Sequence, residues 1–296
     1  MYNPLVSVII PVFNSLNFIS EAIESVLYQT YKNIEIIIID DGSNDGTYEL
    51  LIEKYSANEK INVLTHELRL NKGVNQSRRL GVNFSNGEFL AFLDADDIFE
   101  KNKIECQLNI MKNNIDVVLV HSKVHFINEI DNSDIYFDFS FASKSIKYEI
   151  NLQKFINANH ICNSTVLVRK NKFSKVNLII NQGFQYEDWI QWIILSEHGK
   201  FFYLNESTTS YRYHSQSSSS LLNKNNILKY YANLEKNIIL EKEFRGKKTH
   251  LFFLNNLSLS MNDIYFNLLG SNHNPKVSVF GFYIKYIFYK FIRKLF

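Results

Sequence analysis

Residues 87–97 read Gly-Glu-Phe-Leu-Ala-Phe-Leu-Asp-Ala-Asp-Asp and are the most informative segment of the chain. Its apolar part indicates a buried β-strand, and the strand ends in three carboxylates within four positions. Burying an unpaired carboxylate costs free energy, and neighbouring like charges raise one another's pKa, so such a cluster favours a bound cation. Oxygen ligands with no His or Cys beside them suit Mg²⁺ or Mn²⁺, usually with a phosphate completing the coordination. The alternative is an acidic helix N-cap, which Asp97 alone would supply.

The composition is that of a globular protein. With 296 residues, 46% hydrophobic residues and a formal charge of +2, the chain can bury one large core or two modest ones. The near-neutral charge gives no reason to expect a nucleic-acid partner. Cys106 and Cys162 lack CxxC spacing or a His partner, which predicts free thiols in a reducing compartment. The apolar residues 5–10 are too short for a secretory signal and lack a basic flank, so we expect a cytoplasmic protein.

The first 120 residues alternate between apolar strands and amphipathic helices, which predicts an α/β fold with a mainly parallel sheet covered on both faces. Pro11 is expected to end the first strand. The predicted strands cover residues 6–10, 34–39, 61–64, 89–93 and 116–120, and the predicted helices cover residues 18–27, 47–55, 74–84 and 101–111.

The pattern changes after about residue 126. Residues 127–160 are polar and aromatic with weak periodicity, and strands are predicted at 164–168 and 201–204 with a helix at 189–195 between them. Residues 222–269 are largely helical in pattern. We therefore predict one domain over 1–220, made of two halves (1–125 and 126–220), followed by a helical C-terminal region over 221–296.

Polar residues follow three of the predicted strands: Asn14, the Asp40-Asp41 pair, and the acidic residues 94–97. Ligands of parallel sheets bind beyond the carboxyl ends of the strands, so these residues predict one site. Asp40 can accept a hydrogen bond from a base imide or a ribose hydroxyl, and Gly42 lets the backbone approach a ligand. The alternative for this segment is a helix-capping turn, which Asp45 and Thr47 would serve.

These segments resemble the family 2 glycosyltransferases, an inverting group with the GT-A fold. The resemblance is carried, in family order across residues 5–100, by Val-Ile-Ile-Pro-Val-Phe-Asn (8–14), Asp-Asp-Gly-Ser (40–43), Asn-Lys-Gly (71–73) with Arg78 and Gly81, and Asp-Ala-Asp-Asp (94–97). One departure is Ser-Arg-Arg-Leu at 77–80, where many members carry Ala-Arg-Asn, so whether Arg78 or Arg79 faces the donor is left open.

The resemblance implies a nucleotide-diphospho-sugar donor, usually a UDP-sugar, and bound Mn²⁺ or Mg²⁺. It implies that the domain over 1–220 is catalytic, with 1–125 as its nucleotide-sugar-binding half and 126–220 as its acceptor-binding half. In it Asp40 reads the uracil, Asp96 binds the metal, and Arg78 lies near the base. We expect the metal to be held by Asp94, Asp96 and His214. The residues expected to contact the donor are Pro11, Phe13, Asn14, Asp40, Asp41, Asn71, Arg78, Asp94, Ala95 and Arg212.

Two later segments continue the predicted site. In the family an acidic pair such as Glu187-Asp188 supplies the general base, and the base is usually the second acid, which is Asp188 here. Direct displacement at the sugar needs one base to take the proton of the acceptor hydroxyl. The alternative is that both acids are favoured by the dipole at a helix N-terminus. His214 is expected to contact the diphosphate or the metal; the alternative is that it is a purely structural histidine. Arg212 is expected to bind the diphosphate through its planar guanidinium group.

The last 33 residues, 264–296, contain no acidic side chain and mix lysine and arginine with aromatic residues. Embedded lysines and insufficient length argue against a membrane-spanning helix, so we expect a basic helix in the plane of the inner membrane face over residues 276–296. The alternatives are a helix packed on the catalytic domain or a dimer contact.

The sequence thus predicts a metal-dependent inverting glycosyltransferase, a hexosyl- or N-acetylhexosaminyltransferase. It would transfer a sugar from a UDP-sugar to a glycan or glycolipid acceptor, such as a lipid-linked polysaccharide, capsule or lipopolysaccharide. A sugar-nucleotide nucleotidyltransferase is the alternative enzyme, but residues 12–17 lack the Gly-rich, basic phosphate loop that it would need. A non-catalytic membrane-associated binding protein would leave the carboxylates unexplained.

Overall fold

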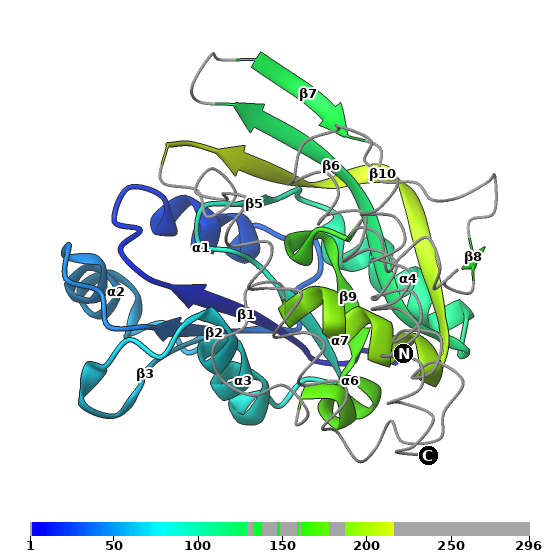
Figure 1. The fold of residues 1–296 in the computed structure, drawn as a ribbon, viewed down its shortest axis with the longest axis horizontal. Helices are drawn as coiled ribbons and strands as arrows, with labels where there is room; N and C mark the ends of the chain where they lie inside the picture. The colour runs from blue at the N-terminus through cyan, green and yellow to red at the C-terminus, as the bar shows by residue number, and fades with distance from the viewer. Residues whose placement is uncertain are drawn as a thin grey trace, which may run out of the picture. The chain divides into compact units, whose positions relative to one another are not determined.

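The structure is a computed structural model that describes residues 2–128, 133–137, 147–148, 159, 161–177 and 187–215. These residues belong to one compact unit of the chain, Met1–Asn151 with Asn159–Leu222. Within it the described strands form a mixed ten-stranded sheet (Figure 1). The helical region expected at 221–296 lies outside the described residues, so its boundary stays a prediction.

The alternation predicted for the first half is confirmed. Strands β3, β2, β1 and β4 lie side by side in that order and run parallel. The elements of this half are β1 (Val6–Val12), α1 (Ile19–Leu27), β2 (Ile34–Asp40), α2 (Thr47–Tyr55), β3 (Ile61–Thr65), η1 (Glu67–Arg69), α3 (Val74–Phe84), β4 (Phe89–Phe92), β5 (Ile98–Phe99) and α4 (Lys103–Asn113).

The second half extends the sheet beyond β4. Strand β9 runs antiparallel between β4 and β6, and β10 runs parallel to β6, so β9 begins and β10 ends at the edge where β1, β2 and β4 end. The strand predicted for 164–168 starts later, at Leu167, because residues 163–165 form a 3₁₀ turn. The remaining elements are β6 (Val117–Asn128), β7 (Ser133–Phe137), β8 (Lys147–Tyr148), η2 (Asn163–Thr165), β9 (Leu167–Arg169), α6 (Lys170–Asn177), α7 (Glu187–Leu195), η3 (Ser196–His198) and β10 (Lys200–Tyr213).

The prediction that Pro11 ends the first strand is wrong, since β1 continues to Val12. In a parallel ladder the backbone groups of residues two positions apart face the same neighbouring strand. The carbonyl of Ile9 accepts a hydrogen bond from the N–H of Leu93 on the β4 side, so the nitrogen of Pro11 also faces the β4 side. The pairing of β1 with β4 ends at Ile9 and Phe92, so the missing N–H of Pro11 faces a position beyond the partner strand.

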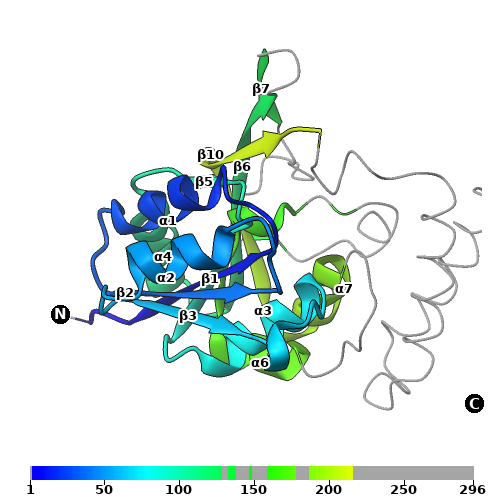
Figure 2. The same cartoon turned by 90° about the vertical axis from the view of Figure 1, so that its left-hand side faces the viewer.

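The two faces of the sheet bury different residues. Val6, Val8, Ile10, Ile36 and Ile38 pack in one core cluster with α1, α2 and α4. The opposite face carries α3, α6 and α7, and Figure 2 shows these two sets of helices on opposite sides of the strands. None of the helices in the described part of the chain combines the length and apolar composition that a bilayer-crossing helix needs.

Gly81 allows α3 to approach the sheet closely. A Cβ atom at this position would lie 2.6 Å from Cγ2 of Ile9 and 2.7 Å from Cδ1 of Ile39. We expect Gly81→Val to lower the free energy of unfolding by about 1–3 kcal/mol, because the added atoms overpack a buried contact. Chemical denaturation measures this, with Asn83→Val on the exposed side of the same helix as the matched control. Equal stabilities of the two variants would contradict the close approach.

Candidate active site

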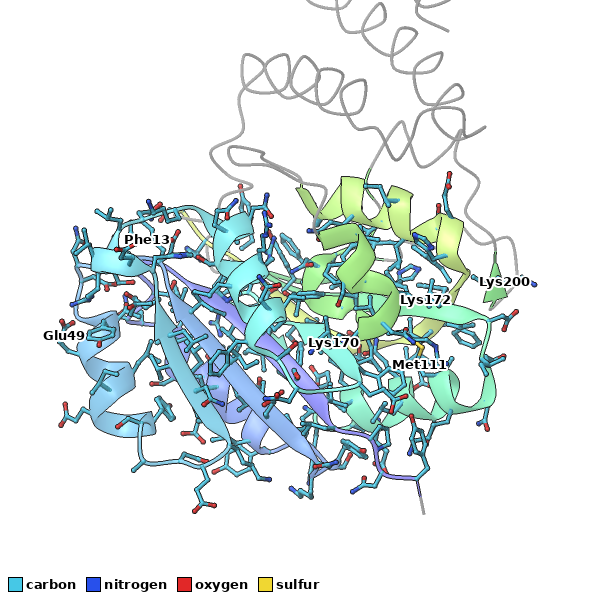
Figure 3. All side chains as sticks on the ribbon, turned by 90° about the horizontal axis from the view of Figure 1, so that it is seen from below. Phe13, Glu49, Met111, Lys170, Lys172 and Lys200 are labelled. Atoms are coloured by element: carbon cyan, nitrogen blue, oxygen red, sulfur yellow. The ribbon has the colours of Figure 1, made fainter. Side chains whose placement is uncertain are left out.

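The carboxyl ends of β1, β2 and β4 meet at one edge of the sheet. Val12 pairs with Asp40 across β1 and β2. Figure 3 shows Phe13, just beyond β1, on the opposite side of the picture from Lys200, where β10 starts. The sheet therefore brings the predicted residues of three strand ends to one edge, together with the end of β10.

Asp40 has the most unusual surroundings at this edge. Its side chain is fully buried, and its Oδ2 accepts hydrogen bonds from the N–H groups of Gly42 and Ser43, each at 3.3 Å. Its Oδ1 is buried without a hydrogen-bond partner among the described residues. The guanidinium of Arg69 lies 3.9 Å from Oδ2 and is held against the Tyr48 ring, 3.8 Å from its centroid. A buried acceptor with an unused oxygen requires a donor, so Asp40 is suited to a ligand N–H.

The loop around Asp40 is tied to the end of β1. Asn14 has a left-handed backbone (φ 48°), which Asn tolerates, and its Oδ1 accepts from the N–H of Asn44 at 2.9 Å. Its own N–H donates to Ser43 Oγ at 3.0 Å. Pro11 is buried within β1, while Phe13 is about half exposed at the edge. Asn14 thus joins two strand ends, and Phe13 is the exposed apolar side chain beside them.

Asp41 is used inside the protein. Its two oxygens accept from the N–H groups of Lys72 (2.7 Å) and Gly73 (2.9 Å), the residues that lead into α3. His66 Nε2 lies 3.4 Å from the same carboxylate. Asn71 is exposed one residue earlier. The structure therefore gives Asp41 the task of shaping this turn, and its predicted contact with the donor stays a prediction.

Arg78 points toward the acidic residues. It is almost fully buried on α3, and its Nη2 donates to Asp94 Oδ1 at 2.6 Å. Arg79 is half-buried at the next position of the helix. Of the two arginines that the sequence left open, Arg78 is the one that contacts the end of β4.

The acidic turn, residues 94–97, contains carboxylates in different environments. Asp97 is fully buried and accepts from Ser164 Oγ at 2.5 Å and from the N–H of Arg212 at 3.1 Å. Burial raises its pKa well above the usual range, and the charges of Asp96 and Asp94 raise it further. Burial, followed by the charge of Asp94, also raises the pKa of Asp96. Asp97 is thus a structural acid, whereas Asp94 and Asp96 remain partly exposed.

The end of β10 braces the acidic turn. Arg212 Nε donates to the carbonyl of Asp96 at 3.0 Å, and its Nη2 donates to Glu21 of α1 at 2.6 Å. His214 Nε2 lies 3.1 Å from Asp96 Oδ2, with its ring 4.6 Å from that of Phe18. The structure brings His214 beside Asp96, as the sequence predicts, and assigns Arg212 contacts that hold Asp96 in place.

The donors at the acidic turn suit a partly protein-bound metal. Among the described residues, no group of three or more His, Cys, Asp or Glu side chains is gathered closely enough to hold a metal. Asp96 and His214 supply one carboxylate and one imidazole, with the charge of Asp94 close by. Mg²⁺ and related ions often use one or two carboxylates and take their other ligands from water and phosphate. The residues therefore fit a metal that a bound diphosphate completes.

Asp188 lies in the first turn of α7 and is half-buried. Its Oδ2 accepts a hydrogen bond from Asn159 Nδ2 at 3.1 Å. Burial raises the pKa of the Cys162 thiol, and the charges of Asp97, Asp94 and Asp188 raise it further. The side chain of Glu187 lies outside the described part of the structure.

A sequence model described as Glycosyl transferase family 2 matches residues 7–176, more than half of the chain. The chain belongs to glycosyltransferase family 2. The matched range contains Asp40, Arg78 and the acidic turn, and it ends before α7.

Relatives of this family 2 chain cover different parts of it. An uncharacterized glycosyltransferase of Methanocaldococcus jannaschii is 30% identical over 262 residues, covering 87% of this chain and 84% of that protein. One from Rickettsia felis is 45% identical over 129 residues, covering 44% of this chain and 21% of that protein, so the match spans about a fifth of its length. The crystal structure of S. aureus TarS 1–349 in complex with UDP-GlcNAc superposes with a TM-score of 0.68 at 18% identity, covering 89% of this chain and 73% of that one. This likeness confirms the expected GT-A fold.

Two contributors to the site were not predicted from the sequence of this family 2 chain. Ser164 and Asn159 contact the acidic turn and Asp188, respectively. Both precede β9, whose antiparallel pairing with β4 places its start at the carboxyl edge. The direction of β9 was the missing signal, because an isolated serine or asparagine in an irregular segment carries no pattern of its own.

Proposed function

We propose that the protein is a metal-dependent inverting glycosyltransferase that transfers a hexose or N-acetylhexosamine from a UDP-sugar to a glycan acceptor. Asp40 carries the proposal, because its buried Oδ1 lacks a donor among the described residues and uracil offers one in its N3–H. The similar fold of TarS, which was crystallised with UDP-GlcNAc, supports the same donor class.

In this proposal the diphosphate lies between Asp40 and the acidic turn. Asp96 and His214 would hold Mn²⁺ or Mg²⁺, with Asp94 adding negative charge and Arg78 binding Asp94. Such an ion neutralises the charge that develops on the leaving nucleotide. Arg212 donates to the backbone carbonyl of Asp96, so it holds in place the backbone that carries the proposed metal-binding carboxylate.

Asp188 is the proposed general base. Inversion requires a group that takes the proton of the acceptor hydroxyl while the hydroxyl attacks the anomeric carbon opposite the leaving UDP. Asn159, which donates to Asp188, and Ser164, which accepts from the N–H of Asp94, are only five positions apart in the chain, and this supports a common site for Asp188 and the acidic turn. Glu187 is the neighbouring candidate.

The acceptor and the membrane contact rest on the sequence. We propose a lipid-linked glycan acceptor at the inner membrane face, approached through the basic, aromatic residues 276–296. This segment lies outside the described residues.

Asp40→Asn tests the donor base. The N–H groups of Gly42 and Ser43 orient the new amide, because its oxygen must accept from them in place of Oδ2. Its NH₂ group then replaces Oδ1 and faces the N3–H of uracil, donor against donor. We expect UDP affinity to fall roughly 10- to 100-fold, while CDP, whose N3 is an acceptor, gains relative to UDP.

Isothermal titration calorimetry with UDP and CDP in the presence of Mn²⁺ measures both affinities. Asp45→Asn makes the same chemical change at an exposed residue whose carboxylate caps the turn before α2, and it should leave UDP affinity unchanged. An Asp40→Asn variant that binds UDP as well as the wild type does would remove Asp40 from base recognition.

A further inference from the structure

A short segment contacts both Asp188 and the acidic turn (residues 94–97). It comprises Asn159 and residues 161–165, and we call it the strap. Its end is firmly anchored, because the carbonyl of Thr165 accepts from Lys103 Nζ at 2.8 Å and from Gln107 Nε2 at 2.7 Å, both fully buried on α4. Ser164, also fully buried, donates to Asp97 and accepts from the N–H of Asp94 at 3.1 Å. The strap is thus fixed to the acidic turn.

At its other end the strap contacts α7. Asn159 Nδ2 donates to Asp188 Oδ2 at 3.1 Å. Asn159 Oδ1 accepts from the backbone N–H of Ile161, also at 3.1 Å. This second bond decides the orientation of the amide, since a flipped group would present its NH₂ to an N–H donor and its oxygen to a carboxylate. The amide of Asn159 is therefore built to donate to Asp188.

The charges of Asp188 and of the acidic turn both act on a residue in the middle of the strap. Cys162 lies between Asn159 and Ser164 in the chain, and its pKa is raised by burial and by the charges of Asp97, Asp94 and Asp188. The hydrogen bond of Asn159 to Asp188 and those of Ser164 to Asp94 and Asp97 attach the two ends of the strap, which therefore sets the placement of Asp188 relative to the acidic turn.

We propose that Asn159 is a positioning residue for Asp188. Its hydrogen bond orients the Asp188 carboxylate relative to the acidic turn and stabilises the ionised form, which is the form that accepts a proton. The inference rests on the proposed function, because it requires Asp188 to be the base. Asn159 acts through Asp188, so its effect depends on that carboxylate being present.

Two substitutions separate this role from a structural one. Asn159→Ala removes both hydrogen bonds of the amide. Asn159→Asp keeps an oxygen for the N–H of Ile161, and so keeps the turn, but replaces the donor to Asp188 by a like charge. We expect each variant to lower turnover roughly 10- to 100-fold, Asn159→Asp at least as much as Asn159→Ala, with UDP affinity unchanged. Asn171→Ala, an exposed amide on α6, is the matched control.

The measurement is UDP release by hydrolysis, with Mn²⁺ and the UDP-sugar that the wild type hydrolyses fastest among UDP-GlcNAc, UDP-GalNAc, UDP-glucose and UDP-galactose. In the Asp188→Asn variant, adding Asn159→Ala should lower turnover by less than about 3-fold further. The effects of two substitutions are not additive when both residues act through the same group. Calorimetry with UDP verifies that each variant is folded.

Wild-type turnover in Asn159→Ala and Asn159→Asp would overturn the inference. It would also be overturned if Asn159→Ala lowered turnover by the same factor in the Asp188→Asn variant as in the wild type. Two other results overturn it through the proposed function and are recognised separately. Full activity of the Asp188→Asn single variant would remove the base, and a wild type that hydrolyses no UDP-sugar of the panel would remove the donor class.

Discussion

Asp188→Asn is expected to lower turnover about 10²- to 10⁴-fold while UDP affinity stays at the wild-type value. An amide cannot take the proton of the acceptor hydroxyl, but its oxygen can still accept from Asn159 Nδ2, so the local geometry should survive. The loss corresponds to about 3–5 kcal/mol of transition-state stabilisation. UDP release from a UDP-sugar under saturating Mn²⁺ measures turnover, and calorimetry measures UDP affinity.

Glu187→Gln is the matched control for this prediction. It makes the same chemical change one residue earlier, and we expect it to lose far less activity. If Glu187→Gln loses more activity than Asp188→Asn, the two residues exchange roles in the mechanism. If Asp188→Asn keeps most of its rate, Asp188 is not the base, and its position at the start of α7 reflects the helix dipole.

Asp96→Ala is expected to abolish the increase in UDP affinity that Mn²⁺ produces. Asp96 is the carboxylate of the acidic turn that lies beside His214, and in the proposed function it is the main protein ligand of the metal, so its removal should weaken metal binding. Without Mn²⁺ the substitution should leave UDP affinity unchanged or raise it slightly, because it removes a negative charge near the diphosphate. The prediction concerns the metal-dependent increment, so a general weakening of UDP binding would not satisfy it.

Calorimetric titration of UDP with and without Mn²⁺ measures this increment in the wild type and the variant. Asp116→Ala removes an exposed carboxylate beside Lys200, at the opposite edge of the sheet, and should keep the full increment. Retention of the full increment in Asp96→Ala would exclude Asp96 as a metal ligand.

The sequence predicted the parallel half of the sheet and its site edge well, because both follow from local patterns. Apolar strands that end in Asp40 or in the acidic turn are continuous in the chain, and parallel pairing brings their ends together without further information. The confirmed alternation of strands and helices in residues 6–120 rests on this.

The sequence did not distinguish carboxylates by their partners. Asp41 and Asp97 resemble Asp40 and Asp96 in sequence, yet Asp41 binds the N–H groups leading into α3 and Asp97 binds Ser164. Burial decides between these roles, and burial depends on which distant segment covers each side chain.

The contacts made by the second half were also beyond sequence reasoning. The contact of Arg212 with the diphosphate stays a prediction. The sequence did not indicate that its guanidinium binds Glu21 and the Asp96 carbonyl, which requires the end of β10 to lie between α1 and the acidic turn. Asn159 and Ser164 reach the site through the antiparallel start of β9. The contacts of Ser164 with Asp97 and of Arg212 with Glu21 join residues more than 60 positions apart, and such contacts leave no periodic signal in the chain.

The most direct test of the account is calorimetric titration of the full 296-residue chain with UDP, GDP and NAD, each with and without Mn²⁺. The account predicts that UDP binds tightly with Mn²⁺ and weakly without it, and that GDP and NAD bind weakly in both conditions. Failure of the folded protein to bind UDP in the presence of Mn²⁺, or equal binding of UDP and GDP, would contradict it.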